Sequence, residues 1–290
     1  MNNVLRVTDH VRHRLEQAGT SDLGRKVLRV RKTSAGDGLF GYDGNYWRAY
    51  DCIENAYAVD AVENLEQGRT AAQSFGNFGR LLADLPEPPL HETIPRFHDG
   101  PSRKQALREA EIKDPCGRVA LARDELAYTR SVDGHYHVLA DLITSKKLPL
   151  RVTHNDTKIN NILFDAKSHQ PLAVIDLDTV MQGTVLYDYG DLVRSCVGTC
   201  AEDESDLSKL ALRPGLYDAL AEGFRAGMAD AMTAVEEDHL RFAAHYMCLL
   251  IGTRFLTDYL LGDTYFKTSR EHHNLERARV QFGLAQLLGK

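Results

Sequence analysis

The segment from residue 153 to residue 179 constrains the fold more than any other part of the chain. It contains two short apolar runs, 162–164 and 173–175, and turn-forming residues bound each of them. Such runs are typical of two short strands joined by a turn. In an antiparallel hairpin, the residue before the first strand lies near the residue after the second. We therefore expect Asn161 and Asp176 to lie close together in space.

The polar residues of this segment have the types and spacing that phosphoryl transfer needs. The sequence THNDTKINNILFD follows the pattern H-x-D-x-K-x-x-N. The carboxylate of Asp156 is suited to orient an acceptor hydroxyl and take its proton. Lys158 would place a cation near the transferring group. Asn161 and Asp176 would supply an amide oxygen and a carboxylate oxygen to magnesium. His154 is interpreted as a hydrogen-bonded residue that braces the loop.

Charge and composition limit the partners of the chain. Its 290 residues are 43% hydrophobic and carry a formal net charge of −6, which argues against nucleic acid or an anionic membrane as the main partner. The N-terminus is polar throughout and no long apolar run is present, so we expect a cytoplasmic protein without a membrane span. No protein partner is evident. Cys196 and Cys200 are four residues apart, but without a second pair we interpret them as buried thiols rather than metal ligands.

The rest of the chain predicts an α+β fold in which helices surround a small antiparallel sheet. Strand candidates lie at 26–32 and 45–53, and the glycine-rich stretch 36–44 between them favours a β-hairpin. Apolar spacing of three and four residues predicts the helices. These are expected at 2–18, at 62–82, twice within 101–146 with breaks near 115–117 and 133–134, at 238–261 and at 270–288.

At the residues 153–179 the chain resembles the aminoglycoside phosphotransferase and choline kinase superfamily, whose members are relatives of protein kinases. The flanking text VIDLDTVMQGTVLYDYGDLVR and GTRFLTDYLLGDTYFKTSREHHNLERARVQ looks like that of N-acetylhexosamine 1-kinases, and the likeness covers nearly the whole chain. The resemblance implies a protein-kinase-like bilobal fold with a mostly helical C-lobe, and a need for ATP and Mg²⁺. It also implies phosphorylation of the anomeric hydroxyl of N-acetylglucosamine or N-acetylgalactosamine. Two alternatives stay open: a kinase of another small alcohol, such as an aminoglycoside or a choline-like compound, and a non-catalytic pseudokinase-like protein.

The resemblance also assigns roles to individual residues of this chain. The implied base is Asp156, with Lys158 beside it, and the implied magnesium ligands are Asn161, Asp176 and Asp178. The backbone of an interlobe hinge would face adenine, and two residues would contact the sugar. The hinge residues are Tyr50, Asp51, Cys52 and Ile53, and the sugar-contacting residues are Arg254 and Tyr265. Asp188 and Asp191 are expected to hold the catalytic loop through hydrogen bonds to its backbone.

Kinases of this type begin with a glycine-rich hairpin over the phosphates, and here the first predicted helix starts near Met1. We therefore expect residues 1–54 to be the remnant of an incomplete small N-lobe and residues 55–290 to be the C-lobe. The glycines at 36–44 are interpreted as turn residues and not as a phosphate loop. Without the upper hairpin the γ-phosphate would be poorly positioned, so we expect slow turnover from the 290-residue chain.

Overall fold

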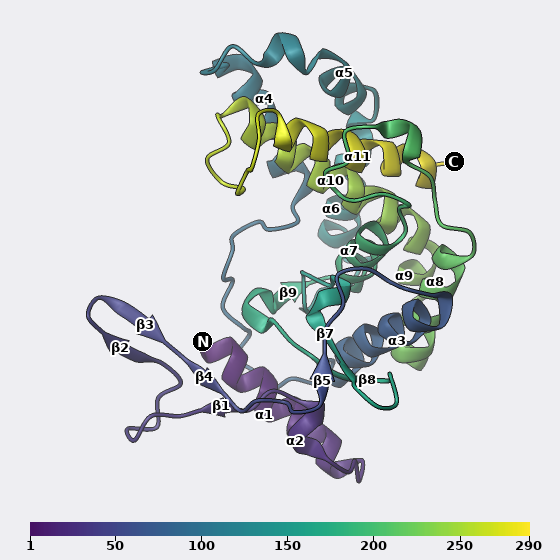
Figure 1. Ribbon diagram of the computed structural model, residues 1–290. Helices are drawn as coiled ribbons and strands as arrows, with labels where there is room; N and C mark the ends of the chain where they lie inside the picture. Colours follow the sequence, from purple (N-terminus) through teal and green to yellow (C-terminus); the bar gives the residue numbers. More distant parts are fainter. The chain divides into compact units, whose positions relative to one another are not determined.

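The computed structural model describes residues 1–290, which divide into two compact units (Figure 1). Unit 1 comprises Met1–Pro95, Arg151–Asp188 and Asp218–Met232. Unit 2 comprises Arg96–Leu150, Tyr189–Tyr217 and Thr233–Lys290. Helices combine with small antiparallel sheets, so the α+β class predicted from the sequence is confirmed. The predicted boundary at residue 54 between an N-lobe and a C-lobe stays a prediction, because the division into compact units does not identify the lobes of a kinase.

Unit 1 contains short strands arranged in four small sheets, together with three helices and most of a fourth. The pairings are β1 with β4, β2 with β3, β6 with β9, and a three-stranded sheet in the order β5-β7-β8. All these pairs are antiparallel. The strands are β1 (Val30–Arg31), β2 (Phe40–Tyr42), β3 (Asn45–Trp47), β4 (Ala49–Tyr50), β5 (Ala56–Tyr57), β6 (Arg151–Thr153), β7 (Ile162–Asp165), β8 (Pro171–Val174) and β9 (Met181–Gly183). The helices are α1 (Asn2–Gln17), α2 (Leu23–Lys26), α3 (Leu65–Leu81) and most of α8 (Leu216–Met228).

The predicted N-terminal helix is confirmed as α1, and its apolar face forms part of the core of unit 1. Val4, Val7 and Val11 recur at three- and four-residue spacing and are almost fully buried. They belong to one apolar cluster with residues of α3 and with Leu177 and Val180, which lie in or next to the short helix η4 (Leu177–Thr179). The cluster therefore anchors the segment that follows Asp176, which is one of the predicted magnesium ligands.

The two predicted N-terminal strands are only partly correct. Residues 23–26 form the helix α2. Of the first predicted strand, 26–32, only Val30–Arg31 is a strand in the structure. The second is divided into β3 and β4, which pair with different partners. Asp43 and Gly44 have positive φ angles of 51° and 71°, a conformation that suits a tight hairpin turn between β2 and β3. The sequence pattern did not reveal β2, because its residues are exposed and give no buried face to recognise.

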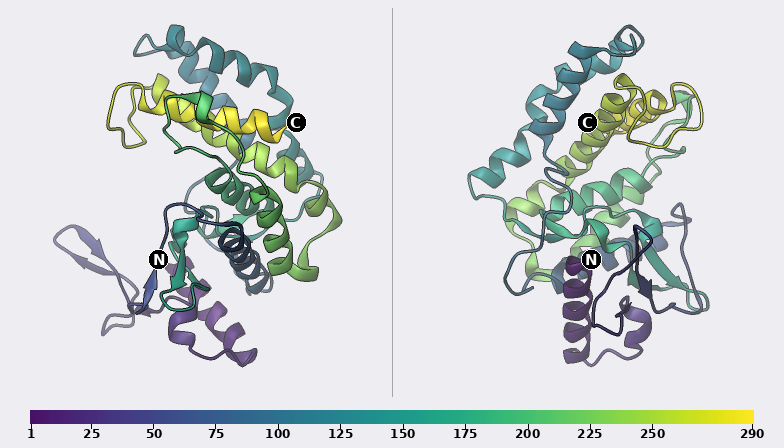
Figure 2. Two further views of the ribbon diagram at one scale, coloured as in Figure 1. Left: turned by 45° about the vertical axis from the view of Figure 1, so that its right-hand side comes forward. Right: turned by 90° about the vertical axis from the view of Figure 1, so that its left-hand side faces the viewer.

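The β2–β3 hairpin projects away from α1 (Figures 1 and 2). Several of its aromatic side chains are exposed. Phe40 and Tyr42 alternate along β2 and therefore share a face, and Trp47 lies opposite Phe40. All three are exposed. After the hairpin, β4 pairs with β1 in an antiparallel ladder. The predicted pairing of the two N-terminal strand regions is therefore confirmed for these short segments.

Unit 2 is mostly helical and is centred on α10 (Leu240–Leu260), which is buried along most of its length. The predicted C-terminal helices 238–261 and 270–288 are confirmed as α10 and α11. The stretch 101–146 holds three helices and not two, because each predicted break ends a helix. The other helices are α4 (Gly100–Lys113), α5 (Arg123–Ser131), α6 (Val138–Thr144), most of α7 (Val185–Cys196), α9 (Ala234–Asp238) and α11 (His273–Leu288).

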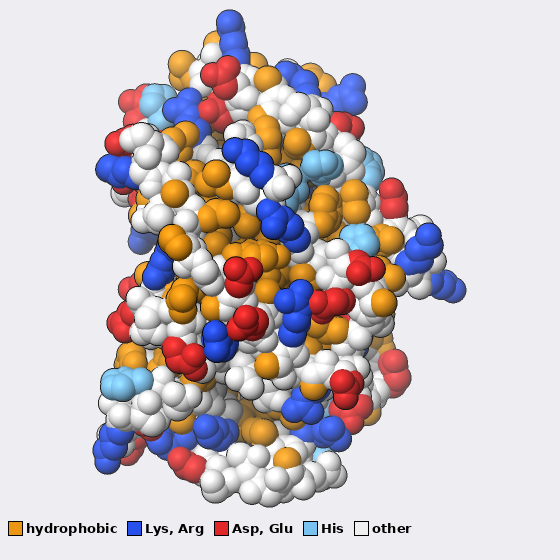
Figure 3. Space-filling model, turned by 90° about the vertical axis from the view of Figure 1, so that its right-hand side faces the viewer, with side chains coloured by type: hydrophobic (Ala, Val, Ile, Leu, Met, Phe, Trp, Pro, Cys, Tyr) orange, Lys and Arg blue, Asp and Glu red, His pale blue; other side chains and the backbone are white.

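None of these helices has both the length and the apolar content that crossing a membrane requires. On the face drawn in Figure 3, basic and acidic side chains are intermixed and do not separate into two large patches. This distribution is in keeping with the small negative net charge of the sequence.

Candidate active site

The predicted pairing of the two strands at 162–164 and 173–175 is confirmed by β7 and β8. Ile162 lies opposite Val174 in this antiparallel ladder. Beyond the ladder, the backbone N–H of Ile175 donates to the carbonyl oxygen of Asn161 over 2.9 Å. This bond ties the residue before β7 to the residue that precedes Asp176. The hairpin thus brings the backbones of two predicted ligand positions to one end of the sheet.

The carboxylate of Asp156 is approached by two of the side chains that the sequence analysis grouped with it. The Lys158 Nζ lies 3.0 Å from its Oδ1. The Asn161 side-chain nitrogen donates to the Asp156 carbonyl oxygen over 2.7 Å and to its Oδ2 over 3.3 Å. The side chain of Asp156 nevertheless keeps 25% of its surface exposed, so its carboxylate remains accessible to a hydroxyl group.

A buried carboxylate fixes the backbone just before Asp156. Asp188, in the first turn of α7, is 2% exposed. Its two oxygens accept the backbone N–H groups of His154 over 2.9 Å and of Asn155 over 2.7 Å. The Thr157 hydroxyl donates to the carbonyl oxygen of Asp188. The prediction that Asp188 holds the loop through its backbone is therefore confirmed.

His154 braces the same loop from the other side, as predicted. Its Nδ1 accepts the backbone N–H of Asp156 over 3.2 Å, so the proton lies on Nε2, which donates to the carbonyl oxygen of Ile175 over 2.9 Å. The ring is fully buried and lies edge-on to Phe75 and Phe78, with centroid distances of 5.7 and 6.0 Å. His154 thus connects the Asp156 loop to the strand end that precedes Asp176.

Close packing around the Asp156 loop explains why residue 183 is a glycine. A Cβ atom at Gly183, in β9, would lie 2.4 Å from the Thr153 hydroxyl and 2.7 Å from the Asn155 side-chain oxygen. The Asn155 nitrogen in turn donates to the carbonyl oxygens of Thr153 and Thr179 over 3.1 Å each. Any larger residue at position 183 would displace this hydrogen-bonded cluster and with it the loop.

Asn161 and Asp176 carry the oxygen atoms that a magnesium ion prefers, so their chemistry suits the predicted role. Asp176 adopts a left-handed conformation, with φ 57° and ψ 60°, between β8 and η4, and its exposed carboxylate does not cap that turn. Asn161 donates to Asp156 through its side-chain nitrogen, so this hydrogen bond does not occupy its side-chain oxygen. Magnesium keeps several waters and is held by one or two carboxylates plus phosphate oxygens, so a closed cage of protein ligands is not needed.

Asp178, the third predicted ligand, already has a cationic partner that the sequence analysis missed. The guanidinium of Arg48, between β3 and β4, pairs with both carboxylate oxygens, and its Nη2 lies 2.7 Å from Oδ2. Hydrogen bonding to Arg48 holds the pKa of Asp178 below its ordinary value. The two residues lie 130 positions apart, so no local sequence pattern could have indicated the contact.

The predicted hinge residues run from β4 towards β5 within unit 1. Tyr50 is half-buried, and burial raises its pKa. The backbone N–H of Asp51 donates to the carbonyl oxygen of Arg29 over 2.9 Å. Cys52 is exposed and Ile53 is buried. Because the Asp51 N–H is already bonded, a nucleotide base would have to use other backbone groups of this segment.

In unit 2 the two predicted sugar-contacting residues lie together. The Arg254 guanidinium carbon is 4.9 Å from the ring centre of Phe97, 5.4 Å from that of Phe266 and 5.7 Å from that of Tyr265. Burial, with the nearby charge of Arg103, lowers the pKa of Arg254 to about 10. A partly desolvated cation surrounded by aromatic faces is a suitable contact for a polar ligand with an apolar side.

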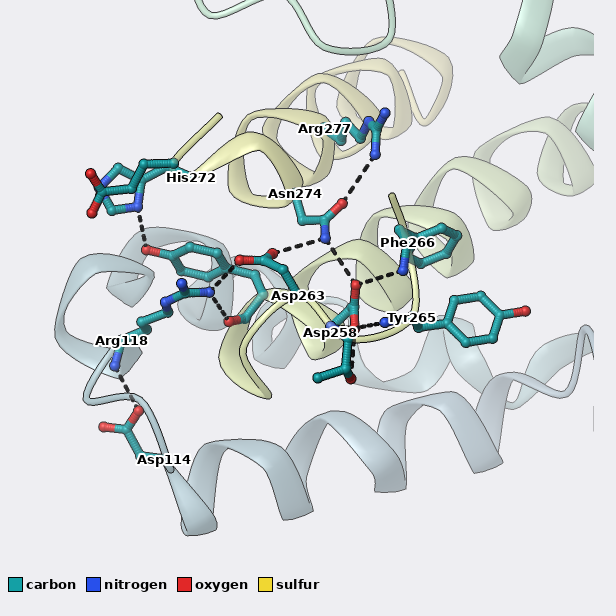
Figure 4. A network of polar contacts seen from close by, with 12 residues as sticks. Asp114, Arg118, Asp258, Asp263, Tyr265, Phe266, His272, Asn274 and Arg277 are labelled. Carbon is teal, nitrogen blue, oxygen red and sulfur yellow. Dashed lines mark hydrogen bonds and ion pairs between the residues drawn. The ribbon is translucent and has the colours of Figure 1, made fainter. Parts of the chain in front are cut away.

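The turn that carries Tyr265 is held by Asp258, another buried carboxylate (Figure 4). Its Oδ1 accepts the backbone N–H groups of Thr264 and Tyr265 over 2.9 and 2.8 Å. Its Oδ2 accepts the N–H of Phe266 and the side-chain nitrogen of Asn274, each over 2.9 Å. This role was not predicted, although an acidic residue inside an apolar helix is a signal of a buried, hydrogen-bonded group.

A second layer of contacts surrounds this turn (Figure 4). Asn274 also donates to Asp263 over 2.9 Å. Arg118 donates to the Asp263 carboxylate and to the carbonyl oxygen of Tyr259, over 2.5 and 2.8 Å. These contacts link the end of α10, the turn and the start of α11 into one hydrogen-bonded network.

The prediction for Asp191 is wrong. Its carboxylate pairs with the Arg194 guanidinium over 2.6 Å, and not with the backbone of the catalytic loop. The two residues are three apart on α7 and therefore lie on the same helical face, where the buried cation neutralises the buried carboxylate.

The overall architecture is that of the kinase-like phosphotransferases. An aminoglycoside phosphotransferase from Alicyclobacillus acidocaldarius aligns with a TM-score of 0.60 at 16% identity, over 99% of this chain and 82% of that one. A microcompartment-associated aminopropanol kinase gives 0.56 at 15%, over 99% and 80%. A spectinomycin phosphotransferase in complex with ADP and spectinomycin gives 0.54 at 13%, over 97% and 83%. The predicted protein-kinase-like, bilobal α+β fold is therefore confirmed.

Residues 9–228 match the model of the phosphotransferase enzyme family, which is more than half of the chain. The chain belongs to this family. The matched range includes the whole Asp156 loop, the β7–β8 hairpin and Asp188.

Proposed function

We propose that the chain transfers the γ-phosphoryl group of ATP to the anomeric hydroxyl of an N-acetylhexosamine, giving the sugar 1-phosphate and ADP. The observation that carries the phosphotransferase part is the fixed, accessible carboxylate of Asp156, beside Lys158 and Asn161. The sugar acceptor rests on the resemblance of the flanking sequence to N-acetylhexosamine 1-kinases.

In this proposal Asp156 orients the acceptor hydroxyl and takes its proton as the oxygen attacks phosphorus. The new bond joins that oxygen to the γ-phosphorus, and the bond to the oxygen shared with the β-phosphate breaks. Lys158, 3.0 Å from Asp156, contributes positive charge where negative charge spreads over the phosphoryl oxygens. The hydrogen bonds from His154 and Asp188 keep the loop in place during the reaction.

Asn161 and Asp176 would hold magnesium through one amide oxygen and one carboxylate oxygen, with Asp178 as a further candidate. The ion would supply charge neutralisation between the phosphate groups. Backbone groups of the segment from Tyr50 to Ile53 would face the adenine base. The ADP-bound spectinomycin phosphotransferase supports nucleotide use, because its fold matches nearly the whole of this chain.

Arg254 and Tyr265 are proposed to contact the acceptor. A guanidinium offers fixed donors to sugar hydroxyls and an aromatic ring offers an apolar face. The positive charge of Arg254, with Arg103 nearby, would disfavour a cationic acceptor such as an aminoglycoside or choline. A neutral N-acetylated sugar avoids this repulsion.

The base assignment is tested by Asp156→Asn. ADP release in the presence of ATP, Mg²⁺ and N-acetylglucosamine should fall by about 10²- to 10⁴-fold, because the amide cannot accept the proton. Thermal unfolding should stay close to that of the unaltered protein, since the amide preserves the shape of the side chain. Full activity in this variant would show that another group is the base.

The acceptor is tested by a panel of N-acetylglucosamine, N-acetylgalactosamine, an aminoglycoside, choline and aminopropanol. ATP consumption should be fastest with the two neutral N-acetylhexosamines. Faster consumption with any of the cationic compounds would reject the sugar acceptor while leaving the phosphotransferase assignment in place. No consumption with any acceptor, together with no shift in unfolding temperature on adding Mg-ATP, would favour a non-catalytic protein.

A further inference from the structure

Arg48 connects the N-terminal hairpin region to the candidate metal site. It lies between Trp47, the last residue of β3, and Ala49, the first residue of β4. Its side chain reaches η4, where its two terminal nitrogens contact the two carboxylate oxygens of Asp178. A guanidinium matches a carboxylate in this two-pronged arrangement better than any other side chain does.

Arg48 lies near an aromatic ring as well as near acidic groups. Its guanidinium carbon is 5.5 Å from the ring centre of Tyr50. The hydrogen bond to Asp178 is the main reason that the pKa of Arg48 is raised, and the charge of Asp176 acts in the same direction. Arg48 therefore places a positive charge against Asp178 and within electrostatic reach of Asp176.

We propose that Arg48 competes with the divalent cation for these carboxylates and so sets the metal concentration that the protein needs. In the ion-free protein Arg48 neutralises Asp178, and when a cation binds at Asn161 and Asp176, Arg48 releases Asp178. This inference rests on the magnesium site of the proposed function and adds to it a residue that no local motif includes.

The exposure of the pair makes such an exchange feasible. The side chains of Arg48 and Asp178 keep 36% and 49% of their surface exposed. Ion pairs this exposed are weak and are readily replaced by water or by another ion. A divalent cation at Asp176 would repel the guanidinium, so the two positive groups oppose each other at one site.

Binding of Mn²⁺ alone tests the competition without reference to catalysis. The free Mn²⁺ signal in electron paramagnetic resonance gives the dissociation constant for the unaltered protein and for Arg48→Gln. The variant should bind Mn²⁺ about tenfold more tightly, because a positive charge that opposes a doubly charged ion has been removed. Unchanged or weaker Mn²⁺ binding would overturn the proposal.

Two further variants make the comparison specific. Arg14→Gln removes an equally exposed arginine, whose Nη1 lies 3.1 Å from the Asp84 carboxylate, and should leave Mn²⁺ binding unchanged. Arg48→Lys keeps the positive charge and should bind Mn²⁺ within about threefold of the unaltered protein. An equal gain in affinity for Arg14→Gln would mean that net charge alone is responsible, which also overturns a specific role for Arg48.

Asp176→Asn separates a failure of this inference from a failure of the metal site. If Asp176→Asn weakens Mn²⁺ binding and Arg48→Gln has no effect, the metal site stands and the role given to Arg48 is wrong. If neither variant changes Mn²⁺ binding, or if the unaltered protein binds none, the proposed magnesium site is wrong. The proposed competition by Arg48 is then rejected as well.

Discussion

The loop before Asp156 and the turn that carries Tyr265 lie in different units, yet a buried carboxylate holds each of them. Asp188 accepts the backbone N–H groups of His154 and Asn155. Asp258 accepts three consecutive backbone N–H groups, from residue 264 to residue 266. Irregular backbone leaves donors that no regular ladder satisfies, and a carboxylate accepts several of them at once.

The two segments differ in what the carboxylate supports. In unit 1 the fixed backbone leads directly into a charged residue, Asp156, so a small displacement moves the proposed reacting group itself. In unit 2 the fixed backbone carries the rings of Tyr265 and Phe266, which lie beside Arg254. We therefore expect the same substitution to affect turnover at the first site and acceptor binding at the second.

Asp188→Asn is expected to have the largest effect. Each Asp188 oxygen accepts one backbone N–H, so either orientation of the amide places an NH₂ group against a donor. The loop should shift, and kcat in the ADP-release assay should fall about a hundredfold, because a displacement near 1 Å costs that much. Stability to urea should also fall by about 2 kcal/mol.

A matched control is Asp165→Asn. Asp165 also accepts backbone N–H groups, from Lys167 and Ser168, but at the turn between β7 and β8. Both N–H groups reach Oδ1, and Oδ2 pairs with Arg25 over 2.7 Å, so the amide keeps the backbone hydrogen bonds and loses this ion pair. That loss destabilises unit 1 away from the Asp156 loop, and kcat should remain near that of the unaltered protein. Equal losses of kcat in both variants would mean that general destabilisation, and not the position of the Asp156 loop, explains the Asp188 result.

Asp258→Asn should have a smaller and different effect. Each oxygen of Asp258 accepts at least two donors, so the amide again meets N–H groups in either orientation. Loosening the turn should raise KM for the acceptor about tenfold, which corresponds to losing about 1.4 kcal/mol of binding. kcat should change little, since the turn does not lead into Asp156.

The control for this prediction is Asp263→Asn in the same network. Asp263 pairs with side chains of Arg118 and Asn274, and its carboxylate does not hold the Tyr265 backbone. KM should therefore rise less than in Asp258→Asn, while stability falls in both. A fall in kcat without a change in KM for Asp258→Asn would contradict the acceptor role proposed for Tyr265.

The comparison also shows which parts of the site a sequence can predict. His154, Asp156 and Asn161 are recognisable because their roles depend on short spacing and on a local hairpin, both of which the sequence encodes directly. The contact between Arg48 and Asp178 depends on the tertiary fold, and the Asp258 turn depends on α10 meeting α11. Neither leaves a periodic pattern that could be recognised without the structure.

Fold prediction succeeded and failed for related reasons. Long amphipathic segments such as 2–18 are predicted well, because one buried face repeats over several turns. The segment 26–32 was mistaken for a strand because Val27 and Val30 are apolar. Both residues are indeed buried, but only Val30–Arg31 pairs with another strand. Burial was thus correctly predicted there, and the type of backbone was not.

The smallest expected effect is a pH dependence confined to unit 2. His245, in α10, donates from Nδ1 to the carbonyl oxygen of Ala285 in α11 over 2.8 Å, and its Nε2 contacts His135 over 2.8 Å. Burial lowers the pKa of His245 below its ordinary value of 6.5, with a further contribution from His135. The unfolded chain therefore binds a proton more readily than the folded chain, and stability should fall as the pH drops below 6.5.

Hydrogen exchange, corrected for the intrinsic effect of pH, measures this loss segment by segment. Between roughly pH 7.5 and pH 5.5, amides of α10 and α11 should lose up to about 1 kcal/mol of protection, and those of the Asp156 loop should not. His245→Asn keeps a donor near the Nδ1 position but cannot take up a proton, so it should abolish the pH dependence. An equal loss of protection in the Asp156 loop would show that acid weakens both units alike, and the distinction between the two regions would not extend to their response to pH.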